Sequence, residues 1–361
     1  MGSLNSLEQL QDSSSLRKHI GADLPSADTL GRVFNLISAD TIRAVNHAIY
    51  ERLKRNKALQ PPWHGLMALA IDGHESHATY KRHCSGCLER KVGTGDSKRI
   101  QYYHRNVTAQ LISNGICFQL DAEPQLPGED EVAAAVRLLE RVIPAYPRAF
   151  DVVLADALYG RSDFFNFIVG HGKDAVVVLK ANCPELLADA KYCFDGKPPT
   201  CVWKQEKKTT EAWDEVGFES GPRLKKPLRV VKSQETKEPV KRQLDETIEV
   251  ETSTWMWMTT LSTHRAGTKA VVELGHSRWS IENHCFNELA SRWHSDHVYK
   301  HDSAAILNFW LLSLLSSNLF QAFFLLNLKP DIRDGKSMLH FARMIASELY
   351  ACLPVSGGVP P

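Results

Sequence analysis

The stretch Leu66-Met67-Ala68-Leu69-Ala70-Ile71-Asp72-Gly73 decides the fold class of this chain of 361 residues. Its six apolar residues in a row are typical of a strand buried on both faces, and a carboxylate with a glycine ends the run. Residues 150–154 form a second such run and also lead to a carboxylate, Asp156. Residues 175–179 form a third, which ends on Lys180. We therefore predict an α/β protein whose strands bring charged side chains to one edge of a sheet.

Helical and hairpin patterns surround these runs. Residues 25–56 have apolar side chains at helical spacing and predict two helices, the second from residue 39 to about residue 54. Residues 102–112 and 116–120 predict two strands joined by a tight turn. An amphipathic helix is predicted over residues 130–142. A further short helix is predicted from Ser162 to Ile168. The middle of the chain therefore has the order β, ββ, α, β, α, β, which predicts a mixed sheet flanked by helices.

The regular periodicity is lost between residues 182 and 262. Within this stretch, residues 204–242 include 11 Lys and Arg. We interpret residues 182–262 as an inserted basic subdomain, β-rich or irregular, because a helical pattern returns from Lys269 onward. The resulting division is a helical N-terminal segment at 1–60, a main domain at 61–181 and 263–330, the insertion at 182–262 and a C-terminal tail at 331–361.

The overall charge is balanced, with 43 Lys and Arg against 42 Asp and Glu. A formal net charge of +1 excludes a uniformly basic binder of polyanions, so any such surface must arise from local segregation of charge. The first 15 residues lack the pattern of a secretory signal, and we expect a reducing compartment. The eight cysteines are therefore interpreted as free thiols or metal ligands rather than as a disulfide framework.

Residues 304–327 have no charged side chain and are long enough to cross a bilayer. They also contain Asn308, Asn318 and Gln321, which are poorly suited to hydrocarbon. We favour a buried core helix over a membrane span, and expect no membrane partner. A membrane-anchored enzyme is the alternative.

Three acids form the main candidate site: Asp72, Asp156 and Glu282. The first two follow buried strands, and the third lies in a helical pattern, Arg278-Trp279-Ser280-Ile281-Glu282-Asn283. Carboxylate oxygens are the ligands that Mg²⁺ prefers. Two such ions about 4 Å apart activate a water or a hydroxyl group and stabilise the leaving oxygen during displacement at phosphorus.

Five motifs, taken together and in their order along the chain, make the sequence resemble the DDE transposases of bacterial insertion sequences. The resemblance is to the branch of this family that has a β-rich insertion before the catalytic glutamate. The motifs are the segment at residues 24–34, Ala70-Ile71-Asp72-Gly73, Ala155-Asp156-Ala157-Leu158-Tyr159-Gly160, Leu179-Lys180-Ala181-Asn182 and the segment at residues 278–283.

The resemblance implies a ribonuclease H-like catalytic domain and an enzyme that cleaves the ends of a mobile element and joins the freed 3′-hydroxyl groups to target DNA. It makes Asp72, Asp156 and Glu282 the catalytic ligands of two Mg²⁺ (or Mn²⁺) ions. It also implies a homodimer with the terminal repeats and target DNA in a synaptic complex, in the bacterial cytoplasm at the nucleoid. The N-terminal segment would contact the DNA end.

The resemblance makes Arg278 a phosphate contact on the same helix face as Glu282. The basic run after Asp72 predicts a phosphate-facing surface. The full set of predicted DNA contacts is Arg278, Lys81, Arg82, Arg105, Lys180 and Lys300.

The family signature has a Tyr three residues before the Arg and a Lys seven residues after the Glu. Here Gly275 and Leu289 hold these two places. The alternative function is therefore a catalytically degenerate DNA-binding protein derived from such an element.

A second group of candidate ligands follows Asp72 closely: His74, His77, Cys84 and Cys87. Two thiols and two imidazoles are sufficient for a tetrahedral Zn²⁺ site. The other interpretation, which we favour, is a loop whose basic residues face DNA phosphates.

Overall fold

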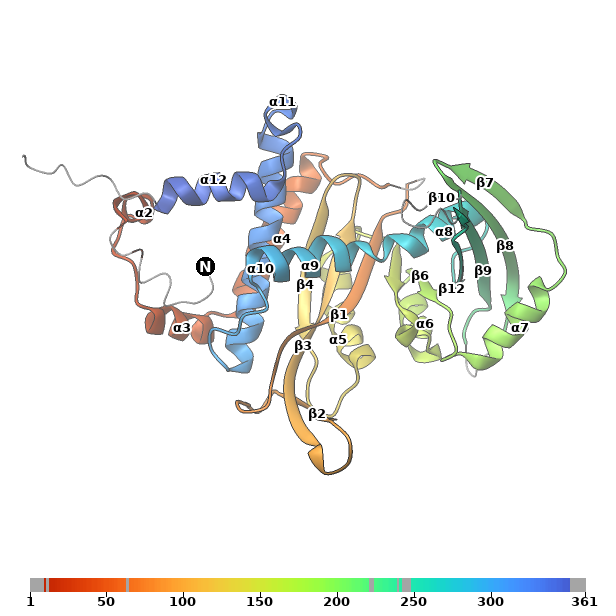
Figure 1. The fold of residues 1–361 in the computed structure, drawn as a ribbon, viewed down its shortest axis with the longest axis horizontal. Coiled ribbons are helices and arrows are strands. Elements are labelled where there is room, and N and C mark those ends of the chain that lie inside the picture. Colours follow the sequence, from red (N-terminus) through yellow and green to blue (C-terminus); the bar gives the residue numbers. More distant parts are fainter. Residues whose placement is uncertain are drawn as a thin grey trace, which may run out of the picture.

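A mixed sheet organises the chain (Figure 1), in a computed structural model that describes residues 10, 13–62, 65–220, 224–238, 240–241 and 248–350. The sheet has ten strands in the order β2-β3-β1-β5-β6-β12-β9-β8-β7, with β4 paired to β3. The strands are β1 (Ala68–Thr79), β2 (Leu88–Val92), β3 (Arg99–Ile112), β4 (Cys117–Pro124), β5 (Val152–Ala155), β6 (Asp174–Val178), β7 (Cys201–Gln205), β8 (Lys208–Phe218), β9 (Leu228–Lys237) and β12 (Thr252–Thr259). A separate ribbon pairs β10 (Val240–Lys241) with β11 (Ile248–Glu249).

Helices cover both faces of this sheet. One face packs against α5 (Glu131–Ala145), α6 (Ser162–Gly170) and α7 (Pro184–Phe194). The other packs against α8 (Thr268–Ser277), the π-helical turn η3 (Glu282–Phe286), α9 (Asn287–Trp293) and α10 (Ser303–Ala322). The remaining elements are α2 (Ser14–Ile20), α3 (Ala27–Leu36), α4 (Ala39–Arg55), η1 (Gly95–Ser97), η2 (Ala157–Tyr159), η4 (Phe323–Asn327), α11 (Pro330–Arg333) and α12 (Met338–Tyr350).

The alternation of side chains along β1 decides which residues enter which layer. Leu69 and Ile71 are buried in the core with α5, whereas Ala68 and Ala70 are buried in the core with α8 and α10. Successive side chains in a strand point to opposite faces. Asp72 lies two residues after Ala70 on the same strand, so its side chain points to the face of the sheet that α8 covers.

The predicted elements of the central region are confirmed, with small shifts in their ends. The two predicted N-terminal helices are α3 and α4. Ser26 caps α3 by accepting a hydrogen bond from the Thr29 amide at 3.2 Å. The predicted hairpin is β3–β4. The prediction that the first strand ends at Asp72 is wrong, because β1 continues to pair with β3 as far as Thr79.

The stretch at residues 182–262 lies on the same sheet as the rest. It begins with α7, which the sequence analysis missed, and its strands extend the sheet because β12 pairs antiparallel with β6. Figure 1 shows β7, β8 and β9 continuing the sheet beyond β6. Two of the 11 basic residues counted there, Arg223 and Arg242, lie outside the described residues.

The uncharged stretch near the C-terminus forms α10 and packs against β4, α4 and α3. Three of its amide side chains, those of Asn308, Asn318 and Gln321, have hydrogen-bond partners within the protein. Asn318 accepts a hydrogen bond from the Gln119 amide at 2.9 Å and donates to the Asn46 side chain, while Asn308 donates to two carbonyl groups near the end of α3. Of the described helices, the segment Ser303–Asn327 alone is long and apolar enough to cross a membrane. The interior hydrogen bonds support a helix of the core.

The predicted C-terminal tail contains a helix, α12, which lies beside α2 (Figure 1). The Ser13 hydroxyl donates to the Leu349 carbonyl at 3.0 Å. The residues after 350 lie outside the described part of the chain, as does Cys352.

Candidate active site

Strands β1 and β5 place Asp72 and Asp156 side by side. The two strands run parallel, and their last register pair is Ala70 with Leu154. Both acids stand two residues beyond that pair, on the same face of the sheet. Asp156 caps η2 by accepting a hydrogen bond from the Leu158 amide at 2.8 Å, and this bond holds its carboxylate at the edge.

Glu282 reaches the same place from a helix that crosses the sheet. In Figure 1, α8 and α9 run in one line across the strands from β12 towards α10. Glu282 begins the π-helical turn between them. Turns of this kind inside helices are frequent at functional sites.

Arg278 joins two of the acids. Its guanidinium donates to Asp72 Oδ2 at 2.8 Å and to Glu282 Oε1 at 2.9 Å. The arginine side chain is only 8% exposed. The guanidinium therefore lies between the two acids, and the phosphate contact expected of Arg278 stays a prediction.

The crowding of carboxylates changes the chemistry of Asp72. Burial raises the pKa of its carboxyl to about 7, Arg278 opposes this rise, and the negative charges of Glu131, Asp156 and Glu282 add to it. Within the described residues, Asp156 Oδ2 and Glu282 Oε2 have no hydrogen-bond partner. A set of hard oxygen donors with excess negative charge fits a divalent cation such as Mg²⁺.

A fourth acid, Glu131, was not predicted from the sequence. It lies in the first turn of α5, which packs against the face of β1 opposite to Asp72. It accepts hydrogen bonds from the Tyr159 hydroxyl at 2.9 Å and from Arg105 at 3.1 Å. A Cβ atom on Gly73 would lie 2.3 Å from Glu131 Oε2, so this carboxylate packs directly beneath the backbone next to Asp72. Burial raises the pKa of Glu131. An acid in the first turn of a helix is common, and no sequence signal separates this one from an ordinary helix start.

The two departures from the family signature have packing reasons. A Cβ atom on Gly275 would lie 2.2 Å from Nε1 of Trp257, so α8 approaches β12 too closely for any side chain there. Leu289 is buried in the core beneath α9. A side chain at position 275 would therefore clash with Trp257, and position 289 faces the core.

The predicted DNA contacts differ in their availability. Lys81, Arg82, Lys180 and Lys300 are exposed. Arg105 instead forms ion pairs with Glu131 and Glu75. Basic side chains of the insertion are also partly neutralised within the sheet, as in the pairs of Lys204 with Glu238, Lys208 with Glu235, Arg229 with Asp214 and Lys237 with Glu251.

The predicted zinc ligands are divided between two environments. His74 stacks on Phe286 and Trp310 and bonds to Asp296, away from the two cysteines. His77 faces the ring of His301. The structure therefore corrects the predicted ligand set.

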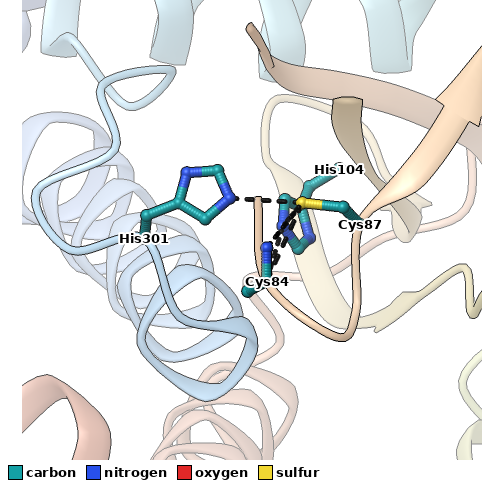
Figure 2. A group of neighbouring side chains, drawn as sticks. All are labelled: Cys84, Cys87, His104 and His301. Atoms are coloured by element: carbon teal, nitrogen blue, oxygen red, sulfur yellow. Dashed lines mark hydrogen bonds between the residues drawn. The ribbon is translucent and has the colours of Figure 1, made fainter. Parts of the chain in front are cut away.

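Two histidines that sequence reasoning missed take the places beside Cys84 and Cys87: His104 and His301 (Figure 2). Burial, together with the neighbouring His301 and His77, lowers the pKa of His104 to about 4, and burial also lowers the pKa of His301. His301 stands 214 residues after Cys87, so the spacing carried no signal for it.

Comparison with known proteins gives a family for most of the chain. The family model described as "Transposase DDE domain" matches residues 64–319, more than two thirds of the length. The match contains the three acids, Arg278 and the four neighbours of Figure 2. No curated protein matches the chain significantly.

Proposed function

This chain belongs to the family of transposase DDE domains, with their ribonuclease H-like fold, and we propose that it is the transposase of a bacterial insertion sequence. In this proposal it cleaves the ends of its element and joins the 3′-hydroxyl groups to target DNA by two-metal phosphoryl transfer. The observation that carries the proposal is the meeting of Asp72, Asp156 and Glu282 at one edge of the sheet, from three distant parts of the chain.

The three carboxylates are the groups that would hold two Mg²⁺ or Mn²⁺ ions. Bound there, such ions activate the attacking water or 3′-hydroxyl group and stabilise the leaving oxygen. Asp156 and Glu282 each present one oxygen without a hydrogen bond in the described structure.

Arg278 sets the charge balance of the site. Its guanidinium binds the carboxylates of Asp72 and Glu282 at nearly equal distances, 2.8 and 2.9 Å, and its positive charge offsets part of the repulsion between them. Glu131, held by Tyr159, supports the backbone of β1 from below. These buried bonds pre-organise the acids before DNA arrives.

DNA would approach along the edge where exposed lysines and arginines lie. Lys180 follows β6, the strand next to Asp156, and supplies a positive charge at the same edge. Lys81, Arg82 and Lys300 are further phosphate contacts in this proposal. A homodimer that joins both element ends, at the nucleoid in the cytoplasm, completes it.

The decisive experiment replaces each acid without changing its size. Asp72→Asn, Asp156→Asn and Glu282→Gln should each lower cleavage of the element ends by about a thousandfold or more, because each removes a charged metal ligand. Binding of the same DNA in a gel-shift assay should stay within about threefold. The substrate is the pair of inverted repeats found in the DNA that flanks the gene.

A matched control is Asp195→Asn, which neutralises an exposed acid at the end of α7. It should cleave like the unmodified protein. Retained cleavage in all three site variants would overturn the proposal. An unmodified protein that binds the ends but cleaves nothing with Mg²⁺ or Mn²⁺ would instead establish the degenerate DNA-binding protein.

A further inference from the structure

A second set of metal-ligating side chains lies apart from the acids. Cys84 and Cys87 stand in the turn between β1 and β2, His104 lies on β3, and His301 lies between α9 and α10. Figure 2 shows the four side chains converging from these three segments. Their ligand atoms all lie within 4.8 Å of one another.

Four of the six distances between these atoms are close to those of ligands around one tetrahedral ion. With Zn–S near 2.3 Å and Zn–N near 2.0 Å, tetrahedral ligands stand about 3.8 Å apart for two sulfurs and about 3.5 Å for sulfur and nitrogen. The two Sγ atoms here are 3.8 Å apart. His104 Nε2 lies 3.3 Å from each Sγ, and His301 Nε2 lies 3.2 Å from Cys87 Sγ. A disulfide would need the sulfurs at about 2.0 Å.

The surroundings are built to hold this geometry. Cys87 and His104 are buried, at 7% and 6% exposure. The Cys87 amide donates to the Cys84 carbonyl at 3.1 Å and closes a tight turn. A Cβ atom on Gly86 would lie 2.2 Å from the Ser303 hydroxyl oxygen and 3.1 Å from Ser303 Cβ, so the turn packs closely against the start of α10.

We propose that Cys84, Cys87, His104 and His301 bind one structural Zn²⁺ ion. Four protein ligands complete a tetrahedron and leave no open position, which is the pattern of structural rather than catalytic zinc. The ion joins the turn after β1 to the segment that follows α9. It thereby keeps the basic residues of that turn beside Lys300.

The zinc site and the acids are separate. His77, the register partner of His104, stands five residues beyond Asp72 on β1, which is roughly 16 Å along a strand. The proposal rests on its own ligands, so its test is independent of DNA cleavage.

The first measurement is the metal content of the full-length protein, purified without chelator from zinc-supplemented cells. We expect about one zinc per chain by mass spectrometry of the metal, and less than about a tenth in Cys87→Ser or His301→Gln. His77→Gln and Cys193→Ser are matched controls outside the ligand set and should retain the metal. Zinc-free unmodified protein would overturn the proposal, as would full zinc content in both ligand variants.

A cobalt measurement keeps the test valid if the ligand variants fail to fold. Protein produced with Co²⁺ in place of zinc, in an Asp72→Asn background, should show the intense visible bands of tetrahedral cobalt and a near-ultraviolet sulfur-to-metal band. Weak bands typical of octahedral oxygen ligands would overturn the assignment.

Discussion

At the scale of single residues, Arg278 is the side chain that links the acids of the site. It reaches Asp72 and Glu282 with two different nitrogens of one planar group. A lysine has one ammonium and cannot reproduce this fork. The role of Arg278 therefore depends on geometry as well as on charge.

We predict that Arg278→Lys lowers the rate of end cleavage by about 10- to 100-fold while the salt dependence of DNA binding stays unchanged. Cleavage kinetics and binding at several salt concentrations measure the two effects. A phosphate contact would behave differently, because losing it weakens binding and reduces the salt slope by about one. That second pattern would contradict the bridging role.

Gly275 is the second residue to consider at this scale, because its position on α8 lies against the ring of Trp257. We predict that Gly275→Ala lowers the free energy of unfolding by about 1 to 2 kcal/mol, because overpacking against Trp257 exceeds the gain in helix propensity. Thermal or urea denaturation measures this. Gly170→Ala is the matched control, since a Cβ there meets nothing within 4 Å, and it should change stability by less than about 1 kcal/mol. Equal behaviour of the two variants would contradict the close approach of α8 to β12.

At the scale of elements, the insertion holds α8 in place. Glu235 on β9 is buried and accepts hydrogen bonds from His276 on α8 and from Lys208 on β8. Burial alone would raise the pKa of this carboxyl, but the bonds from His276 and Lys208 outweigh burial and lower the pKa to about 2. This contact lies two residues before Arg278, so it positions the helix that carries the site.

The lowered pKa predicts a pH-dependent stability. A carboxyl with a pKa near 4.3 when unfolded and about 2 when folded stabilises the protein above about pH 5, and this stabilisation disappears as the pH falls towards 2. Glu235→Gln should therefore lower the free energy of unfolding by about 2 to 3 kcal/mol at pH 7, and the difference should shrink below pH 5. Denaturation curves at several pH values measure it, with the exposed Glu140→Gln as the control. A difference independent of pH would contradict the ion pairing.

At the scale of the whole molecule, the sheet is continuous from β1 and β5 to the strands of residues 182–262. Strand β6 is buried along its length and pairs with β5 on one side and β12 on the other. The insertion therefore completes the sheet and the core beneath α8, where Trp257 is fully buried.

We predict that replacing residues 196–260 by a short Gly/Ser linker yields insoluble protein, because it exposes the edge of β6 and removes part of the core. A chain ending at residue 336 is the control. It should stay soluble, since Phe341 is the one residue of α12 that is buried in the described structure. Soluble fraction and cooperative thermal melting measure both. A soluble, cooperatively melting deletion would show that the insertion is an accessory domain.

The sequence by itself predicted most of the central elements and the order of the candidate acids, although it did not predict α7 or the full length of β1. Runs such as residues 66–71 and 150–154 are local patterns, and they predicted strands that lead to Asp72 and Asp156. The structure pairs these two strands in parallel. The motif at residues 278–283 predicted the third acid through its resemblance to a family.

Only the tertiary structure decided how distant side chains meet. Arg278 contacts Asp72 across 206 residues, and His301 joins Cys87 across 214. Such contacts arise when helices pack across a sheet, and local periodicity contains no information about them. The acids and their order could be predicted from local patterns in the sequence. The contacts of Arg278, the position of Glu131 and the neighbours of the two cysteines depend on the folded chain and could not be predicted in this way.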